Sequence, residues 1–384
     1  MSPIVLVSRL AGVWLGGMCG IAIYNLMTAR RLDRVPGPVE HPGVSLLIPA
    51  RDEESTLRRT LPLATSTRYP NLEILVLDDG STDGSAAVVE DIAAHFPQVR
   101  LVRGTPPPAG WLGKCWACHQ LAEIASGEII IFCDADVEMG PFAVERTIAT
   151  MQQSGADVLT ALPRQITPDT LGAAVVPLIA QLPVLATLPL RLVERVASPL
   201  LAMGNGQWIA FRRESYAQAG GHIRVKAEVV EDVALARAAK ASGSRLAVAL
   251  ATDDLSVLMY TDGQALRSGF QKNLYQLSGG RPLPFLLVLT VFSTTMIFPL
   301  AAPFLPGGSR TLPLLLTLLR LTGVAALRHP WRSALLHPLG AILGAALALD
   351  SARATRRGST SWKGRPIPAP NRAGHSNTVN GKQR

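Results

Sequence analysis

The sequence has little charge, few aromatic side chains and few cysteines. Charged residues make up 17% of its 384 residues, and aromatic residues only 5%. Basic residues are not interleaved with aromatics, so the composition excludes the usual classes of nucleic-acid-binding domain. Four cysteines are too few for a disulfide framework in a chain of this length. We therefore expect reduced thiols, as in a cytoplasmic domain.

Charge of either sign is missing from two long runs, and acids are missing from the C-terminal end. Residues 10–27 and 282–309 carry no charged side chain and are long enough to cross a membrane. Two shorter apolar stretches, 311–327 and 333–349, follow them. After Asp350 there are eight Lys or Arg residues and no acid, which accounts for most of the net charge of +9. This tail fits either binding to anionic lipid headgroups or a solvated segment that only fixes topology.

The first apolar run is followed by three arginines, Arg30, Arg31 and Arg34. By the positive-inside rule they place the next domain in the cytoplasm. The alternative, a cleavable signal peptide, needs a small-x-small cleavage site, which is lacking before the arginines. We expect a transmembrane anchor with its basic flank at 1–34, transmembrane segments at 282–350, and a basic, disordered tail at 351–384.

Between these runs, strand-like and helix-like stretches alternate. Strands are expected at 44–48, 73–77, 98–102, 128–132 and 157–160, and helices at 52–67, 81–96, 112–126 and 141–153. This rhythm predicts an α/β fold with a doubly wound, mostly parallel sheet. Residues 171–203 are apolar but broken by four prolines. Both a surface-lying helical stretch and a buried core segment fit them.

Three groups of carboxylates are spread along the α/β stretch: Asp78-Asp79, Asp134 with Asp136, and Glu231-Asp232. The first two groups directly follow apolar runs that are typical of buried parallel strands. Ligands of open α/β sheets bind at that edge of the sheet. Converging acids repel one another unless a cation lies among them. The pattern therefore predicts a phosphate-bearing substrate held with a divalent cation, magnesium or manganese.

The residues alone leave individual roles open. Asp78 and Asp79 fit hydrogen bonds to a nucleobase or ribose. The Asp-rich motif of prenyl-transfer enzymes is disfavoured there, because that motif lies on a helix and these acids follow a strand. Glu231-Asp232 fits either a general base or ordinary acids at a helix N-terminus. Lys114 fits either a diphosphate contact or a surface lysine.

A haem protein is a separate alternative. The stretch Cys115-Trp-Ala-Cys118-His119 matches the motif of covalent haem attachment. Such attachment requires export, which the arginines after the first apolar run oppose. A membrane scaffold with the same fold and no activity is a further alternative.

Taken together, the motifs resemble family-2 inverting glycosyltransferases, which have the GT-A nucleotide-sugar fold. The resemblance covers residues 44–280 and rests on Pro49-Ala-Arg-Asp-Glu-Glu54, Asp78-Asp-Gly-Ser-Thr-Asp83, Asp134-Ala-Asp136 and Glu231-Asp232. It implies that four residues bind the nucleotide sugar: Pro49 and Asp79 at the nucleobase, Lys114 near the nucleotide, and Asp134 near ribose and diphosphate. It also implies that Asp136 binds the metal and that Asp232 is the catalytic base.

A narrower similarity concerns the membrane-bound branch that glucosylates hydroxylated carotenoids, such as the hydroxychlorobactene glucosyltransferases. It rests on Gly110-Trp-Leu-Gly-Lys-Cys-Trp-Ala-Cys-His-Gln-Leu121, Met203-Gly-Asn-Gly-Gln-Trp208, Gly220-Gly-His222 and Gly269-Phe-Gln-Lys-Asn-Leu274. It implies transfer of a hexose, glucose, from a nucleotide diphosphate sugar to a hydroxyl of an apolar lipid, a carotenoid. Hopanoid-associated glycosyltransferases share the Gly-Trp-x-Gly-Lys piece, so a hopanoid is the alternative acceptor.

One departure from the family separates this chain from its polymerising members. Processive synthases carry Gln-x-x-Arg-Trp beyond the base, whereas here Gln264-Ala-Leu-Arg267 is followed by Ser268. The tryptophan that would hold a growing chain is missing. We therefore expect a single transfer rather than polymerisation.

Overall fold

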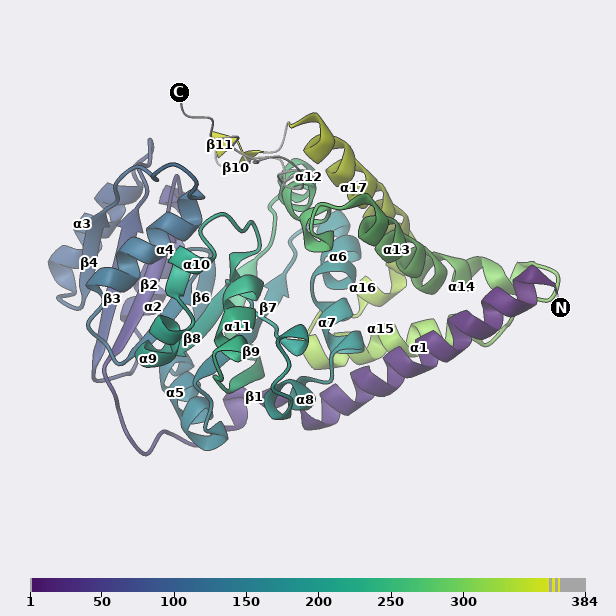
Figure 1. The fold of residues 1–384 in the computed structure, drawn as a ribbon, viewed down its shortest axis with the longest axis horizontal. Helices are drawn as coiled ribbons and strands as arrows, with labels where there is room; N and C mark the ends of the chain where they lie inside the picture. The colour runs from purple at the N-terminus through teal and green to yellow at the C-terminus, as the bar shows by residue number, and fades with distance from the viewer. Residues whose placement is uncertain (1, 359–360, 363–364, 367–384) are drawn as a thin grey trace, which may run out of the picture.

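The computed structural model describes residues 2–358, 361–362 and 365–366, and it has an α/β part and a helical part (Figure 1). The α/β part lies on the left of Figure 1. The helical part extends to the right and narrows toward the N-terminus. The residues from 367 onward, most of the tail that we expected to be disordered, lie outside the described residues.

Within the described residues, one nine-stranded sheet has the order β1-β9-β7-β8-β5-β2-β3-β4, with β6 paired to β9. Its strands are β1 (Arg30–Arg31), β2 (Val44–Ala50), β3 (Leu72–Asp78), β4 (Val99–Arg103), β5 (Ile129–Cys133), β6 (Val137–Met139), β7 (Val158–Ile166), β8 (Trp208–Arg212) and β9 (Leu246–Leu258). The four strands from β4 to β5 are parallel, and β8 is antiparallel to both of its neighbours. The predicted mostly parallel α/β sheet is therefore confirmed. A short two-stranded sheet joins β10 (Ser361–Trp362) and β11 (Arg365–Pro366).

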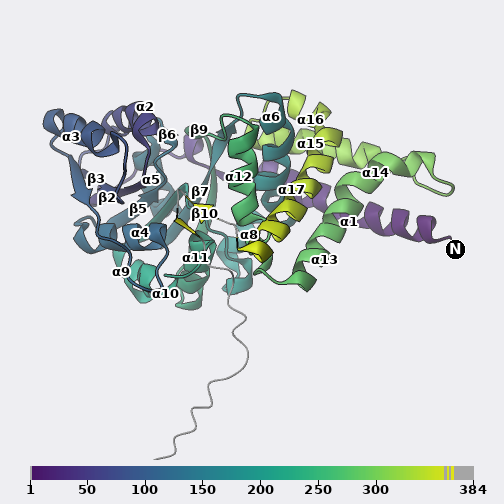
Figure 2. The same ribbon diagram turned by 90° about the horizontal axis from the view of Figure 1, so that it is seen from above.

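Helices cover both faces of the sheet, as a doubly wound fold requires. They are α2 (Glu54–Thr65), α3 (Ser85–His95), α4 (Gly113–Ile124), α5 (Ala143–Ser154), α9 (Arg213–Gln218), α10 (Gly221–Arg224) and α11 (Glu231–Ala241). Leu57 of α2, Val89 of α3 and Ile148 of α5 share one buried cluster with Ile74 of the sheet. Figure 2 shows α2 and α4 on opposite sides of the strands. Each predicted helix exists, with ends shifted by a few residues.

The helical part is built from the two ends of the chain and one internal segment. Its elements are α1 (Pro3–Thr28), α6 (Thr170–Val176), the π-helical η2 (Pro177–Gln181), α7 (Leu182–Thr187), α8 (Leu190–Arg195), α12 (Gly263–Asn273), α13 (Pro282–Phe292), the π-helical η5 (Ser293–Ile297), α14 (Phe298–Ala301), α15 (Leu312–Leu327), α16 (Arg332–Leu335) and α17 (His337–Arg357). Short 3-10 turns are η1 (Leu32–Arg34), η3 (Pro199–Leu201), η4 (Gln276–Ser278) and η6 (Ala302–Phe304). Because α17 continues to Arg357, the first residues of the expected tail are helical.

By length and composition, three described helices are long and apolar enough to cross a membrane: Pro3–Thr28, Thr170–Thr187 and Pro282–Phe304. The first and third expose many large apolar side chains, among them Leu10 and Val13 on α1 and Leu283 and Leu287 on α13. An apolar surface of this extent is typical of contact with lipid or with a partner protein. α15, with 16 residues, is shorter than a usual span.

The internal segment, Thr170–Thr187, behaves differently, because 61% of its apolar window is buried inside the protein. Ala174, Val175 and Leu185 are fully covered. α6 packs on α17, and α7 packs on α1. For Thr170–Thr187, the buried core segment is the alternative that the structure shows, whereas Leu192 and Leu200 in the rest of the apolar stretch are exposed.

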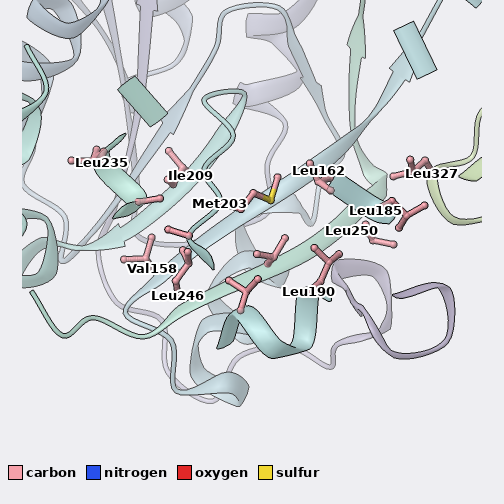
Figure 3. Packing of buried hydrophobic residues seen from close by; sticks show 14 of the residues in the cluster. Val158, Leu162, Leu185, Leu190, Met203, Ile209, Leu235, Leu246, Leu250 and Leu327 are labelled. Carbon is pink, nitrogen blue, oxygen red and sulfur yellow. The ribbon is translucent and has the colours of Figure 1, made fainter. Parts of the chain in front are cut away.

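The two parts share one hydrophobic core. Figure 3 shows Leu162 of β7 and Leu250 of β9 beside Leu185 of α7 and Leu327 of α15, and Leu190 of α8 belongs to the same buried cluster. The same cluster continues to buried residues along α1 and α15. One face of the sheet therefore packs directly onto the helical part, with no linker between them.

Polar contacts of α1 and the residues after it add to this junction. Arg30 pairs with Glu194 at 2.8 Å, and Arg31 donates a hydrogen bond to Thr252 at 3.0 Å. Arg30 and Arg31 also form β1, which pairs with β9. The basic flank of the first apolar run is thus built into the edge of the sheet.

Asn25 of α1 is fully buried and bonded on both ends of its amide. Its Nδ2 donates to the carbonyl oxygens of Leu185 at 2.7 Å and Leu188 at 2.8 Å, and its Oδ1 accepts from the backbone N–H of Leu190 at 2.9 Å. These bonds satisfy the backbone at the break between α7 and α8, where helical bonding is interrupted.

We predict that Asn25→Leu lowers the free energy of unfolding by about 2–4 kcal/mol, because it leaves buried carbonyl and N–H groups without partners. The thermal midpoint of the purified protein in detergent should fall clearly below that of the wild type. Tyr24→Leu, at the neighbouring exposed position, serves as the control. An unchanged midpoint in Asn25→Leu would contradict this interpretation of the junction.

Candidate active site

The carboxyl ends of β2, β3 and β5 open into a pocket of about 180 Å³. The strands are parallel neighbours, with Ala50 opposite Asp78 in the register, so the residues that follow them meet at one edge. The pocket is lined by Pro49, Ala50, Arg51, Glu53, Asp79, Lys114, Ala117, Asp134, Ala135, Asp136 and Lys272. Five of the six predicted site residues are among them.

The sixth, Asp232, lines a smaller pocket that shares Pro49, Lys114 and Asp134 with the first. The structure therefore brings together all the residues that the sequence marked as a site, although they come from five separate stretches of the chain. The second and third carboxylate groups are joined by Lys114, which contacts Asp134 of one and Glu231 of the other.

Lys114, in the first turn of α4, bridges two of the carboxylate groups. Its Nζ lies 2.8 Å from Asp134 Oδ1 and 2.9 Å from Glu231 Oε1. Burial alone would lower the pKa of Lys114, but the two neighbouring carboxylates raise it well above its usual value. The ammonium group therefore stays charged and partly neutralises the acids. The surface-lysine alternative does not fit this placement.

Asp232, at the start of α11, accepts hydrogen bonds from two backbone N–H groups, one in the loop before β8 and one in α11 itself. Its Oδ2 accepts a hydrogen bond from the N–H of Gly206 at 2.6 Å, and its Oδ1 accepts one from the N–H of Val233 at 2.8 Å. Burial and the charge of Glu231 raise the pKa of Asp232 to about 6. The carboxylate is thus mostly ionised near pH 7 and still basic enough to take a proton.

The loop that supplies Gly206 approaches Asp232 so closely that side chains would not fit. A Cβ at Gly204 would lie 2.2 Å from the carbonyl oxygen of Asp232, and one at Gly206 would lie 3.0 Å from Lys114 Nζ. Asn205 fixes the loop by donating through its backbone N–H to Thr160 Oγ1 at 2.9 Å. In the sequence, this Gly-Asn-Gly stretch contributed only to the family resemblance. The structure shows that it supplies a backbone donor to Asp232.

Asp136 has a buried carboxylate oxygen, Oδ1, without a hydrogen-bond partner in the described part of the protein. Burial comes first among the causes that raise its pKa to about 7, followed by the charges of Asp134 and Glu53. An orphaned carboxylate in a polar pocket fits a cation. The described residues contain no group of three or more His, Cys, Asp or Glu side chains placed to hold a metal. A cation here would thus take most of its ligands from substrate phosphates and water, as Mg²⁺ commonly does.

The two acids of the first group have separate surroundings. The N–H of Asp79 donates to Ala50 O at 2.8 Å, and Arg51 Nη1 donates to Asp79 O at 2.8 Å, which fixes Asp79 at the pocket wall. Asp78 instead pairs with Arg103 at 3.3 Å and does not line the pocket. Of the pair, Asp79 is therefore the acid that lines the pocket.

Three further acids of the Pro49–Glu54 and Asp78–Asp83 motifs bond the two loops to each other. Glu54 Oε2 accepts from the N–H of Gly84 at 3.0 Å, and the N–H of Glu54 donates to Asp83 Oδ2 at 3.0 Å. Asp52, in the left-handed region at φ 49°, accepts from the N–H of Thr82 at 2.7 Å. These reciprocal bonds cap α2 and α3 and hold the pocket rim.

Residues of the haem-like motif lie in the core. The Cys115 and Cys118 side chains are 1% and 2% exposed, and burial raises the pKa of both thiols. Cys115 Sγ lies 3.5 Å from Val225 O, and His119 stacks on Trp111 with 5.1 Å between ring centroids. Thiols packed in this way have no room for a porphyrin, so the motif helps to pack α4 against α10.

Comparison with known proteins agrees with this geometry. Residues 45–220 match the family model described as Glycosyl transferase family 2. The 4,4'-diaponeurosporenoate glycosyltransferase of Staphylococcus aureus is 28% identical over 272 residues, which cover 68% of each chain. The probable glycosyltransferase YdaM of Bacillus subtilis is 36% identical over 99 residues, 25% of this chain and 23% of YdaM, so the chain spans less than a quarter of that relative.

Among solved structures, the mannosyltransferase PcManGT from Pyrobaculum calidifontis, in complex with GDP-Man and Mn²⁺, has a similar fold. The TM-score is 0.53 at 20% identity, and the match covers 91% of this chain and 98% of that one. The protein is therefore a glycosyltransferase of the GT-A fold. Residues 45–220 match family 2 of these enzymes, and the chain is similar to a carotenoid glycosyltransferase.

Proposed function

We propose that the protein is a membrane-anchored inverting glycosyltransferase that moves one hexose, glucose, from a nucleotide diphosphate sugar to a hydroxyl of an apolar lipid, a carotenoid. The observation that carries the proposal is the position of Asp232. Its ionisable carboxylate lines a small pocket together with Lys114, and Lys114 pairs with Asp134 of the donor pocket and with Glu231, the residue before Asp232.

The donor would bind at the strand ends in the larger pocket. Pro49 and Asp79 line the part at which the base would lie, and Asp134 lies beside Lys114, where ribose and diphosphate would follow. The lysine offsets charge on the departing nucleoside diphosphate without moving, because ion pairs already fix it.

A divalent cation, magnesium or manganese, fits Asp136. When bound, such an ion neutralises charge on the diphosphate oxygens as a Lewis acid. The unpartnered carboxylate oxygen of Asp136 supports its role as the protein ligand. Burial, followed by the charges of Asp134 and Glu53, raises the pKa of this group, and a cation would offset those charges.

Asp232 would act as the general base. The acceptor hydroxyl gives its proton to the carboxylate as its oxygen attacks the anomeric carbon, and the bond to the diphosphate breaks in the same step. A single in-line displacement inverts the anomeric centre. The backbone donors at Gly206 and Val233 leave Asp232 ordered for this transfer.

The choice of a carotenoid as acceptor is supported by the apolar helices and by the relative that acts on diaponeurosporenoate, a carboxylate. The acceptor hydroxyl rests on the resemblance to enzymes that glucosylate hydroxylated carotenoids. Helices α1 and α13 present apolar side chains to their surroundings, as a protein that takes its acceptor from a bilayer would. The shared core keeps the site fixed relative to these helices. The three arginines after α1 support a catalytic domain on the cytoplasmic face. A hopanoid or another lipid acceptor is the second candidate, favoured by Gly110-Trp-Leu-Gly-Lys114.

Mass analysis of membrane lipids tests the proposal. Cells that make a hydroxylated carotenoid and express the wild type should accumulate that carotenoid with one added hexose. Asp232→Asn should lower the rate by a factor on the order of 10²–10⁴, because the base is lost. Asp136→Asn should remove the stimulation by Mn²⁺. Asp91→Asn, on an exposed face of α3, is the matched control.

Three outcomes would count against the proposal. Unaltered lipids in the presence of wild-type protein would contradict the acceptor, and hexosylated hopanoids would establish the second candidate instead. Full activity in both aspartate variants would contradict the mechanism and favour a different set of catalytic groups.

The pH dependence of transfer provides a separate prediction. Because Asp232 must be ionised and its pKa is raised to about 6, activity should fall as the pH drops through that region. Glu231→Gln removes the charge that raises this pKa, so the acidic limb should move to lower pH. An acidic limb that stays in place, measured as kcat/KM for the donor, would show that another group is titrating.

A further inference from the structure

Helix α12 (Gly263–Asn273) brings a lysine from the C-terminal half of the chain into the donor pocket. Lys272, in the last turn of this helix, lines the same pocket as Asp79, Lys114 and Asp136. The side chain is half-buried. It lies beyond residue 220, where the match to the family model ends.

Acids outnumber cationic side chains in the lining of the donor pocket, which contains Glu53, Asp79, Asp134 and Asp136 with Arg51, Lys114 and Lys272. Arg51 donates to the carbonyl oxygen of Asp79 at the pocket wall. Lys114 already divides its charge between Asp134 and Glu231. Asp79 and Asp136 add further negative charge to the lining. A nucleoside diphosphate brings more, and oxygens of this kind bind best to ammonium or guanidinium donors.

Gly269 allows α12 to approach the site. A Cβ at this position would lie 2.2 Å from Cε1 of Tyr260, so only glycine lets the helix rest on that ring. Tyr260 itself is held at φ 40°, a region that side chains rarely adopt, and its ring lies 5.3 Å from that of Phe270. Gly269 and Lys272 are three residues apart and therefore lie on one face of α12.

Helix α17 fixes the other side of α12, and the two helices lie side by side (Figures 1 and 2). Arg267 donates to both oxygens of Asp350, at 2.8 and 3.0 Å, and Gln271 donates to Asp350 at 3.0 Å. Ser351 Oγ donates to the carbonyl oxygen of Gln271 at 2.6 Å and accepts from the N–H of Tyr275 at 3.0 Å. These bonds fix α12 residues before Lys272 in the sequence and Tyr275 after it.

We propose that Lys272 binds the diphosphate of the donor, and that Asp350 and Ser351 of α17 are positioning residues that hold α12 in place for this contact. The inference rests on the proposed nucleotide diphosphate sugar donor. It makes donor binding depend on a helix of the C-terminal helical part, which packs against α6 and α13.

Binding of defined nucleotides to the full-length protein in detergent tests the lysine. UDP and GDP serve as the diphosphate probes, and uridine and guanosine as the uncharged ones, each measured by calorimetry with Mn²⁺ present. Lys272→Met should weaken binding of the preferred diphosphate about tenfold, the usual value of one charge-assisted contact, and leave its nucleoside unchanged. Lys272→Arg should restore most of the loss. Lys226→Met, at an exposed lysine outside the pocket, should have no effect.

The positioning role is tested by combining variants. Asp350→Asn alone should weaken diphosphate binding about threefold and leave nucleoside binding intact. Added to Lys272→Met, it should cause no further loss, because it acts through the lysine that is already gone.

The outcomes separate the two levels of the proposal. A wild-type protein that binds neither diphosphate overturns the donor class, and the inference with it. A wild type that binds a diphosphate while Lys272→Met binds it equally well overturns only the role of the lysine. A Lys272→Met variant that loses nucleoside and diphosphate binding alike would assign the lysine to the fold. Additive losses from Asp350→Asn would overturn the positioning role.

Discussion

An ammonium group between two carboxylates is the interaction on which this site depends. Lys114 joins Asp134, which follows β5, to Glu231, which opens α11. Without that charge, the acids of two distant chain segments would repel each other at close range. With it, they form one wall. Beside Glu231, burial and the charge of that neighbour raise the pKa of Asp232 to about 6, which suits proton transfer.

The second constraint is the core shared by the α/β and helical parts. Leu162 and Leu250 of the sheet lie beside Leu185 and Leu327 of the helical part, in one buried cluster. A separate catalytic domain on a flexible linker would have to find its acceptor by diffusion. Here the site is held at a fixed place relative to helices that expose apolar side chains, so the geometry suits an acceptor that arrives from a lipid phase.

The sequence predicted the parallel half of the sheet well, because Ile129–Cys133 and the strands like it are continuous apolar runs followed by acids. It missed β8 and β9, whose antiparallel and edge pairings depend on distant partners. It also marked six candidate site residues, which the structure places in two adjoining pockets. Their grouping rested on family resemblance, since nothing local reveals that Glu231 contacts Lys114. Lys272 lies in the Gly269–Leu274 stretch that carried the narrower resemblance, but nothing local placed it in the pocket, because α12 reaches the pocket through its packing on Tyr260 and α17.

The central claim is that Asp232 acts as the general base in a single displacement, beside the pocket wall that Lys114 joins. The anomeric configuration of the transferred sugar tests this claim most directly. The coupling constant of the anomeric proton in the purified glycolipid gives this configuration by nuclear magnetic resonance. With a donor in which the sugar is α-linked to diphosphate, we predict a β-linked product. An α-linked product would require two displacements or a different mechanism, and would contradict the assignment of Asp232 as the sole base.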